Sequence, residues 1–174
     1  MTLADFTSPD LIVPQLRGQD VAAVIEELGA VLQRKGRVPD LLSFYRAALD
    51  REFRVGTNWE SGMAFPHARL TDLKELSFAL GRCTESLVWG AGSKPNVKLV
   101  FLIAVPIPES TQYLSLISGL ARLAKEQGLL HKLHTAEGSL EMFDVLRLVE
   151  LRSAADTTKR STVAPLSKPS TSLT

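Results

Sequence analysis

The sequence predicts an α/β fold, a layered domain in which a mixed central sheet is flanked by helices. Apolar residues repeat at helical spacing in the first third of the chain, the middle third changes to strand-like alternation, and helical spacing returns after Pro108. The longest unbroken apolar run, LVFLIAV at residues 99–105, is far shorter than the roughly 20 residues of a membrane-spanning helix. We therefore expect a buried strand there.

Two helices are expected after an N-terminal arm or short strand over residues 1–19. Asp20 can cap the first helix, whose apolar positions follow at intervals of three and four and which stops at Gly36. Pro39 and Asp40 start the second helix. The apolar faces comprise Val21, Val24, Ile25, Leu28 and Leu32 in the first helix, and Leu41, Tyr45, Ala48, Leu49 and Phe53 in the second.

The middle of the chain has the pattern of strands. In ELSFALGRC, residues 75–83, bulky residues alternate with small ones, which fits a strand with one face crowded by a neighbouring element. We interpret SLVWGAGSKPN, residues 86–96, as a short strand that leads into a loop. In VKLVFLIAVP, residues 97–106, neither face is polar after Lys98, so we expect this strand in the centre of the sheet.

The last third predicts three more helices. The first carries an apolar stripe and ends at Gly128, a short one covers residues 129–135, and the last begins at Ser139. The domain should end near Arg152, and residues 153–174, rich in Ser, Thr, Pro and Lys, should form a flexible tail. The stripe of the first of these helices comprises Leu114, Ile117, Leu120, Ala121 and Ala124.

Charge and cysteine content argue against several classes of protein. The net charge is +1, with 20 Lys and Arg spread among 19 Asp and Glu, so nothing favours nucleic acid as a partner. The single cysteine, Cys83, excludes an internal disulfide framework. The N-terminus lacks a cationic start followed by an apolar core. We therefore expect a cytoplasmic protein without direct membrane insertion.

Few residues are candidates for metal or cofactor chemistry. His131 and His134 lie one helical turn apart but lack a third ligand at motif spacing, so a solvated helix face is favoured over a metal site. Cys83 is interpreted as a small hydrophobic residue at a strand end, although Arg82 beside it could lower its pKa. GAGSKPN, residues 90–96, lacks the spacing of a phosphate-binding loop. We therefore expect no metal and no organic cofactor.

The segment SGMAFPHAR, residues 61–69, places His67 directly after a proline at the end of an apolar run. One interpretation is an edge strand whose ladder Pro66 stops, with a histidine that happens to follow. The other is an anion or phosphoryl site, because Arg51, Arg54 and Arg69 could bring positive charge close. If a backbone acceptor holds one ring N–H, the other ring nitrogen keeps its lone pair and becomes a fixed nucleophile.

Together with two upstream features, this segment resembles a known family. The pattern RE, then GT, then Gly-x-Ala-x-Pro-His is similar to that of the enzyme IIA domains of the fructose and mannitol type, including the nitrogen-regulatory branch, in the bacterial phosphoenolpyruvate-dependent sugar phosphotransferase system. The order of helices and strands fits the fold of that family over residues 5–152. The matching residues are Arg51, Glu52, Thr57, Gly62, Ala64, Pro66 and His67.

The resemblance implies roles for these residues. His67 would accept a phosphoryl group from the histidine-containing phosphocarrier protein and pass it to a permease component, or signal the phosphorylation state to a regulatory target protein. Arg51 would contact the phosphate. Apart from the resemblance, we expect Thr57 and Arg69 to support the same site. Such transfer needs no cofactor. The apolar helix faces leave room for a homodimer.

One departure from the family pattern opens an alternative. Family members usually carry a second histidine beside the first, where this chain has Gln112 or, on a shifted alignment, Tyr113. The amide of Gln112 could still donate to a phosphate oxygen or fix the tautomer of His67. The alternative function is a regulatory module that docks onto a target protein, with reduced or no onward phosphotransfer. A hydrolase with His67 as general base lacks a recognisable nucleophile.

Overall fold

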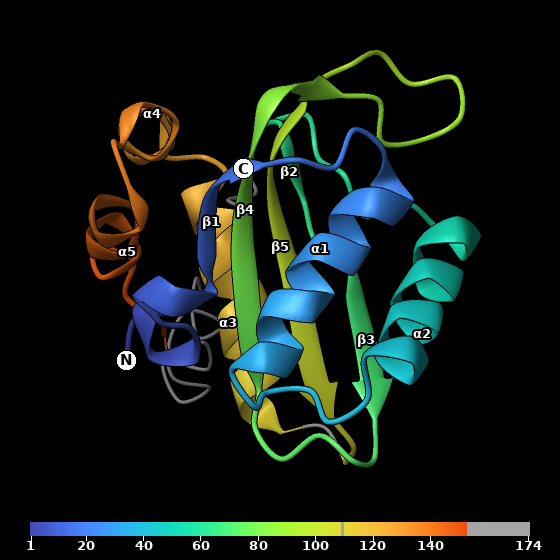
Figure 1. The fold of residues 1–174 in the computed structure, drawn as a ribbon. Helices are drawn as coiled ribbons and strands as arrows, with labels where there is room; N and C mark the ends of the chain where they lie inside the picture. The colour runs from blue at the N-terminus through green and yellow to red at the C-terminus, as the bar shows by residue number, and fades with distance from the viewer. Residues whose placement is uncertain (109, 153–174) are drawn as a thin grey trace, which may run out of the picture.

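A computed structural model describes residues 1–108 and 110–152, and the predicted tail, residues 153–174, lies outside the described residues. Within these described residues, five α-helices and five strands form one layered unit (Figure 1). In chain order the elements are the 3₁₀ turns η1 (Leu3–Phe6) and η2 (Pro9–Leu11), β1 (Ile12–Leu16), α1 (Val21–Arg34), α2 (Leu41–Arg54), β2 (Met63–Ala64), β3 (His67–Leu70), β4 (Ser77–Leu87), β5 (Val97–Pro106), α3 (Thr111–Leu123), α4 (Gln127–Thr135) and α5 (Ser139–Leu146).

The sheet is mixed, as the sequence predicted. Its strand order is β1-β4-β5-β2, and β3 also pairs with β5. Strands β2 and β3 run parallel to β5, β4 runs antiparallel to β5, and β1 runs parallel to β4. Helices α1 and α2 cover one face, α3 covers the other, and α4 and α5 lie beyond β1 (Figure 1). The layered α/β fold is confirmed.

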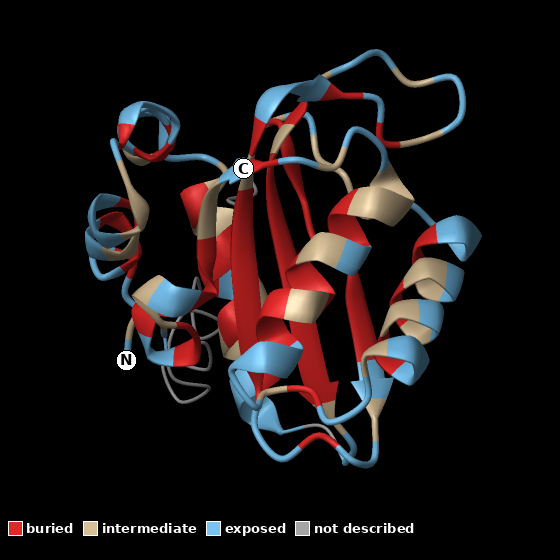
Figure 2. Cartoon of the chain, in the orientation of Figure 1, coloured by how far each residue is buried: buried red, intermediate tan, exposed pale blue. Residues whose placement is uncertain are grey.

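Strand β5 lies in the interior of the sheet and is buried on both faces, as its sequence predicted (Figure 2). Phe101 and Ile103 belong to the core on the α3 side, and Val100 and Leu102 to the core under α1 and α2. Full burial of a side chain of this size contributes about 1.5–3 kcal/mol. Residues 86 and 87, expected in a separate short strand, instead continue β4, whose pairing with β5 shifts in register between Arg82 and Leu87.

The first two helices begin where the sequence predicted. The Asp20 side chain accepts a hydrogen bond from the Ala23 amide at 2.8 Å, and the Asp40 side chain accepts one from the Leu42 amide at 3.1 Å. The predicted apolar face of α2 was wrong in one respect, because Phe53 is 74% exposed. The buried line runs through Phe44, Ala48 and Glu52 instead. Its last member is a carboxylate, which a search for apolar periodicity does not find.

The predicted stripe of α3 was also partly wrong. Leu114 is 66% exposed, whereas Tyr113, Leu116, Leu120 and Leu123 are buried. The reason is a close approach at Gly119, where a Cβ atom would overlap the side chains of Leu151 and Leu3. This contact turns the line through Leu116 and Leu120 toward the core. Both lines of the helix are apolar, so the sequence pattern alone did not distinguish them.

The segment that contains His67 lies at an edge of the sheet. Strand β2 ends at Ala64 and β3 begins at His67, with Phe65 and Pro66 between them. Gly62 enters this edge with φ of +82°, and its carbonyl accepts from the amides of Lys98 at 2.9 Å and Leu99 at 3.2 Å. The segment is therefore an edge strand, as one interpretation expected, but Pro66 does not stop the ladder, because its carbonyl accepts from the Ile103 amide and β3 pairs with β5 from His67 on. The edge position does not exclude a functional site there.

Gly62 should tolerate substitution much less well than Gly36. Both residues have positive φ, which costs a non-glycine residue about 1–2 kcal/mol. A Cβ on Gly62 would also lie 2.8 Å from the Asn96 carbonyl oxygen, whereas a Cβ on Gly36 meets nothing within 4 Å. We expect Gly62→Ala to lower the free energy of unfolding by about 2–4 kcal/mol and Gly36→Ala by about 1 kcal/mol. Urea unfolding measures both losses, and equal losses would contradict the close approach.

Candidate functional site

His67 opens β3 and lies beside a small cavity on the α3 side of the sheet edge. The cavity has a volume of about 230 Å³, and the His67 side chain is largely buried, with 9% of the residue exposed. The end of α2, the loop after it, the Phe65 to His67 turn and α3 all contribute to the wall. The lining residues are Arg51, Gly56, Thr57, Trp59, Phe65, His67, Tyr113, Ile117 and Leu120.

One ring nitrogen of His67 is held by the backbone. Nδ1 lies 3.0 Å from the carbonyl oxygen of Phe65, two residues earlier in the chain. A carbonyl oxygen can only accept, so Nδ1 carries the proton in this hydrogen bond. The neutral ring then has its lone pair on Nε2. Because the backbone holds the Nδ1–H group, Nε2 is the ring nitrogen that can act as a fixed nucleophile.

The loop beside His67 is held by the buried carboxylate of Glu52. Oε1 of Glu52 accepts from the Thr57 amide at 2.7 Å and from Nε1 of Trp89 at 2.7 Å, and Oε2 accepts from the Thr57 hydroxyl at 2.8 Å. The Thr57 hydroxyl oxygen in turn accepts from the Phe65 amide at 3.0 Å. Thr57 therefore supports the site through the backbone of Phe65, and its hydroxyl proton is already engaged.

Two of the three predicted arginines contribute positive charge to the site. Arg51 lines the cavity from the last turn of α2, where its Nη1 donates to the Val55 carbonyl at 2.9 Å. Arg69 lies on β3 with its guanidinium carbon 5.0 Å from the centre of the Tyr113 ring. Arg54 is instead exposed and forms an ion pair with Asp50 at 2.7 Å.

The surroundings of His67 keep its ring neutral near pH 7. Burial lowers the pKa of the imidazole below its ordinary value of 6.5, and the hydrogen bond to Phe65 acts in the opposite direction. The charges of Arg51 and Arg69 lower the pKa further, while Glu52 raises it. The net direction is downward, so Nε2 retains its lone pair.

Of the two residues considered for the position of the second histidine, the structure brings Tyr113 to the site. The rings of Tyr113 and His67 lie 6.3 Å apart between centroids, and Tyr113 lines the same cavity. Gln112 is exposed and lines a different cavity, together with Asp5, Lys74 and Pro108. The placement therefore gives Gln112 no contact with the His67 cavity, because side chains at adjacent helix positions point in different directions.

Sequence reasoning missed the contribution of Trp89 and the buried position of Glu52. Trp89 lies in the connection between β4 and β5, far from Glu52 in the sequence. Glu52 carried a signal, since it forms part of the RE pair, but a charge near a helix end is more often exposed. The hydrogen bond between Trp89 and Glu52 joins residues that only the fold brings together, so the sequence pattern did not predict it.

The other candidates from the sequence do not form a site in the described residues. His131 and His134 are exposed, and no three metal-ligating side chains converge within residues 1–108 and 110–152. Burial raises the pKa of the Cys83 thiol to about 11, which keeps it protonated. None of the described helices could cross a membrane, since each is too short or too polar.

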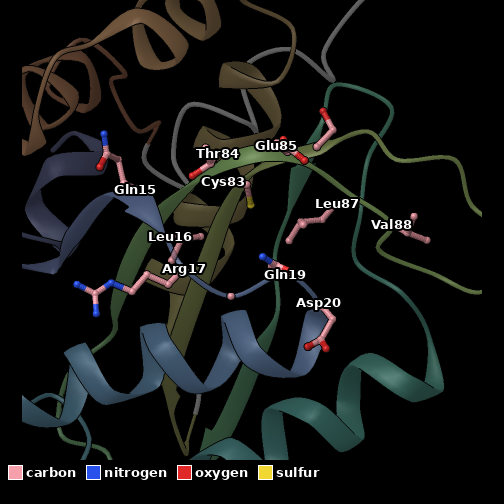
Figure 3. Close-up of a pocket in the computed structure, with 12 residues that line it drawn as sticks. Gln15, Leu16, Arg17, Gln19, Asp20, Cys83, Thr84, Glu85, Leu87 and Val88 are labelled. Carbon is pink, nitrogen blue, oxygen red and sulfur yellow. The ribbon is translucent and has the colours of Figure 1, made fainter.

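A larger cavity, of about 810 Å³, lies between the β1–α1 connection and the end of β4 (Figure 3). Its wall includes Asp20, but the carboxylate of that residue already accepts from the Ala23 amide. The amides of Arg17 and Gly18 in the same wall donate to Glu27, each at 2.9 Å. Since local contacts engage these polar groups, this cavity has fewer features of a reactive site than the one beside His67.

The chain matches a family model and a curated protein of known sequence. The family model described as "Phosphoenolpyruvate-dependent sugar phosphotransferase system, EIIA 2" matches residues 5–148. The transcriptional regulator ManR of Bacillus subtilis is 32% identical over 127 residues, which make up 73% of this chain and 19% of that protein. The chain thus spans about a fifth of the length of this curated relative.

Two solved structures have the same fold. The nitrogen regulatory protein IIA-Ntr from Neisseria meningitidis has a TM-score of 0.71 and 22% identity, over 83% of this chain and 98% of that one. Enzyme IIAMtl of Escherichia coli, solved in complex with phosphorylated enzyme IIBMtl, has a TM-score of 0.67 and 17% identity, over 80% of this chain and 95% of that one.

The lowered pKa of His67 makes stability depend on pH in a defined direction. Below the ordinary value of 6.5 the unfolded chain binds a proton at this position more readily than the folded protein does. The contribution of neutral His67 to stability is therefore present above pH 6.5 and is lost as the pH falls through the folded pKa. Urea unfolding between pH 8 and about pH 5 should show a larger loss for the wild type than for His67→Gln.

An NMR titration of the His67 ring checks the same pKa directly. We expect a midpoint below 6.5. A midpoint above that value would mean that Arg51, Arg69 and burial do not dominate the surroundings of the ring.

Proposed function

Because the chain belongs to the EIIA 2 family of the phosphoenolpyruvate-dependent sugar phosphotransferase system, we propose that it carries a phosphoryl group on Nε2 of His67. The observation that carries this proposal is the hydrogen bond between Nδ1 of His67 and the Phe65 carbonyl, beside a cavity lined by Arg51. This bond leaves Nε2 as the nitrogen with a free lone pair. The geometry supports a nucleophile that faces positive charge.

The proposed step is transfer from a phosphohistidine of the histidine-containing phosphocarrier protein. The Nε2 lone pair forms the new N–P bond, and the electron pair of the breaking N–P bond stays on the donor nitrogen. Each ring keeps the proton on its other nitrogen, so no separate acid or base is required. As positive charge develops on the His67 ring, the Phe65 carbonyl at Nδ1 stabilises it.

Arg51 is the proposed phosphate ligand. It lines the His67 cavity, and a guanidinium can hold two phosphoryl oxygens at once. The charge of Arg69 also acts on His67, and Thr57 acts indirectly by fixing the Phe65 backbone. Phosphoryl transfer depends mainly on positioning and charge stabilisation, so this small set of residues is sufficient without a metal or organic cofactor.

The onward acceptor distinguishes two forms of this function. In the first, a cytoplasmic carrier passes the group to a permease component; in the second, the protein signals its phosphorylation state to a regulatory target. Two observations favour the second form: Tyr113 lies beside His67 where the family usually has histidine, and the similar ManR is named as a transcriptional regulator. Discharge of the phosphorylated protein by a cognate EIIB component would favour the carrier, and retention would favour the regulator.

Phosphorylation of His67 is tested by incubating the protein with phosphoenolpyruvate, enzyme I and the phosphocarrier protein. We expect intact mass to increase by one acid-labile phosphoryl group in the wild type and not at all in His67→Ala. His131→Ala and His134→Ala are matched controls, since these are the other two histidines of the chain. No mass gain in a folded wild type with a cognate donor would overturn the proposal.

Arg51 and Arg54 provide a second, paired test. A hydrogen bond to a charged group contributes about 1.5–3 kcal/mol, so Arg51→Ala should slow phosphoryl acceptance roughly 10- to 100-fold. Arg54→Ala removes the same charge one turn away, outside the cavity, and should change the rate less than about threefold. Rapid-quench measurements of the acid-labile phosphate give both rates. Equal effects would mean that only the net positive charge matters.

A further inference from the structure

We propose that Trp89 and Glu52 are positioning residues that hold His67 in the tautomer with Nε2 free. The importance of this tautomer for phosphoryl transfer rests on the proposed function, but the tautomer itself is a property of the unphosphorylated protein. Trp89 comes from the β4–β5 connection and Glu52 from the last turn of α2. The two residues would thus link distant parts of the chain to the orientation of one ring.

Glu52 and Trp89 are both buried, and they form a hydrogen bond with each other. Glu52 is 5% exposed and Trp89 is 3% exposed, and the indole N–H donates to the carboxylate at 2.7 Å. A buried carboxylate is stable only if its oxygens are well supplied with donors. Within residues 1–108 and 110–152 Glu52 forms no ion pair, so its donors are Trp89 and Thr57.

The hydrogen bonds continue from Glu52 through the Thr57 hydroxyl to the Phe65 amide. The Thr57 hydroxyl proton is donated to Oε2 of Glu52, so its oxygen faces the Phe65 amide as an acceptor, at 3.0 Å. A protonated or displaced Glu52 would free that hydroxyl to rotate. The Phe65 amide would then lose the acceptor that holds this residue in place.

The carbonyl of Phe65 completes a series of hydrogen bonds that runs from Trp89 through Glu52, Thr57 and Phe65 to His67. Phe65 donates its N–H to Thr57 and accepts at its carbonyl from Nδ1 of His67 at 3.0 Å. The position of Phe65 therefore decides whether the proton stays on Nδ1. Loss of the Trp89 donor leaves Oε1 of Glu52 with the Thr57 amide alone, which weakens the whole series.

Trp89→Phe and Tyr45→Phe form a test and its control. Trp89→Phe keeps an aromatic ring in the core and removes the indole N–H. Tyr45→Phe also removes a polar hydrogen from an aromatic residue that packs against the same core as Trp89, but Tyr45 does not line the His67 cavity. The ¹⁵N chemical shifts of the His67 ring, measured near pH 8 in unphosphorylated protein, report the tautomer.

We expect the share of the Nε2–H tautomer to rise about fivefold in Trp89→Phe and to stay at the wild-type level in Tyr45→Phe. Glu52→Gln should raise it further, because the amide presents one acceptor oxygen in place of two. If Trp89→Phe unfolds, Thr57→Val and Thr57→Ser test the same series at a half-buried position. Val should raise the Nε2–H share, and Ser, which keeps the hydroxyl, should restore it.

An unchanged tautomer in folded Trp89→Phe and Glu52→Gln, or in Thr57→Val, would overturn the inference. Since the tautomer is read without any phosphoryl donor, such a result leaves the phosphorylation of His67 unaffected. Conversely, a wild type that accepts no phosphoryl group but responds to Trp89→Phe would count against the proposed function alone. In phosphorylation-competent protein, Trp89→Phe should also slow acceptance in proportion to the fall in the Nδ1–H share, which is less than about twofold while Nδ1–H remains the major tautomer.

Discussion

The carboxylate of Glu52 is the constraint on which the site depends. An ionised carboxylate in a largely apolar environment is costly, so its three donors must be held in place. Those donors come from Thr57 and Trp89, which ties the end of α2, the loop after it and the β4–β5 connection together. Because Glu52 requires these donors, Thr57 and with it the loop after α2 are held in one position.

The position of Phe65 and His67 at the sheet edge explains how the hydrogen bonds of Glu52 affect the His67 ring. The Pro66 carbonyl accepts from the Ile103 amide at 2.9 Å and so continues the pairing with β5. Neighbouring carbonyls of a strand point to opposite sides, which directs the Phe65 carbonyl away from β5. On an interior strand another strand would pair with it, whereas on this edge the ring of His67 does. A strand edge, usually a liability, here supplies the acceptor that fixes a tautomer.

Local signals predicted most of the fold. Asp20 and Asp40 marked the starts of helices, and the apolar run in β5 marked the buried strand, because caps and burial leave their pattern in nearby residues. The motif also favoured a position of Arg51 near His67, and both residues line one cavity. The orientation of α3, the choice of Tyr113 over Gln112, and the Trp89 to Glu52 hydrogen bond depend on contacts between distant residues. Gly119 against Leu3 and Leu151 is one example, and no window of the sequence contains it.

The most direct test of the account is to identify which ring nitrogen of His67 carries the phosphoryl group. Two-dimensional ¹H–¹⁵N and ³¹P NMR spectra of the phosphorylated protein distinguish the two isomers. Since the Phe65 carbonyl occupies Nδ1, the account predicts phosphorylation at Nε2 alone, with the Nδ1 proton retained. A phosphoryl group on Nδ1 would contradict it, because that product cannot form while the Phe65 hydrogen bond holds.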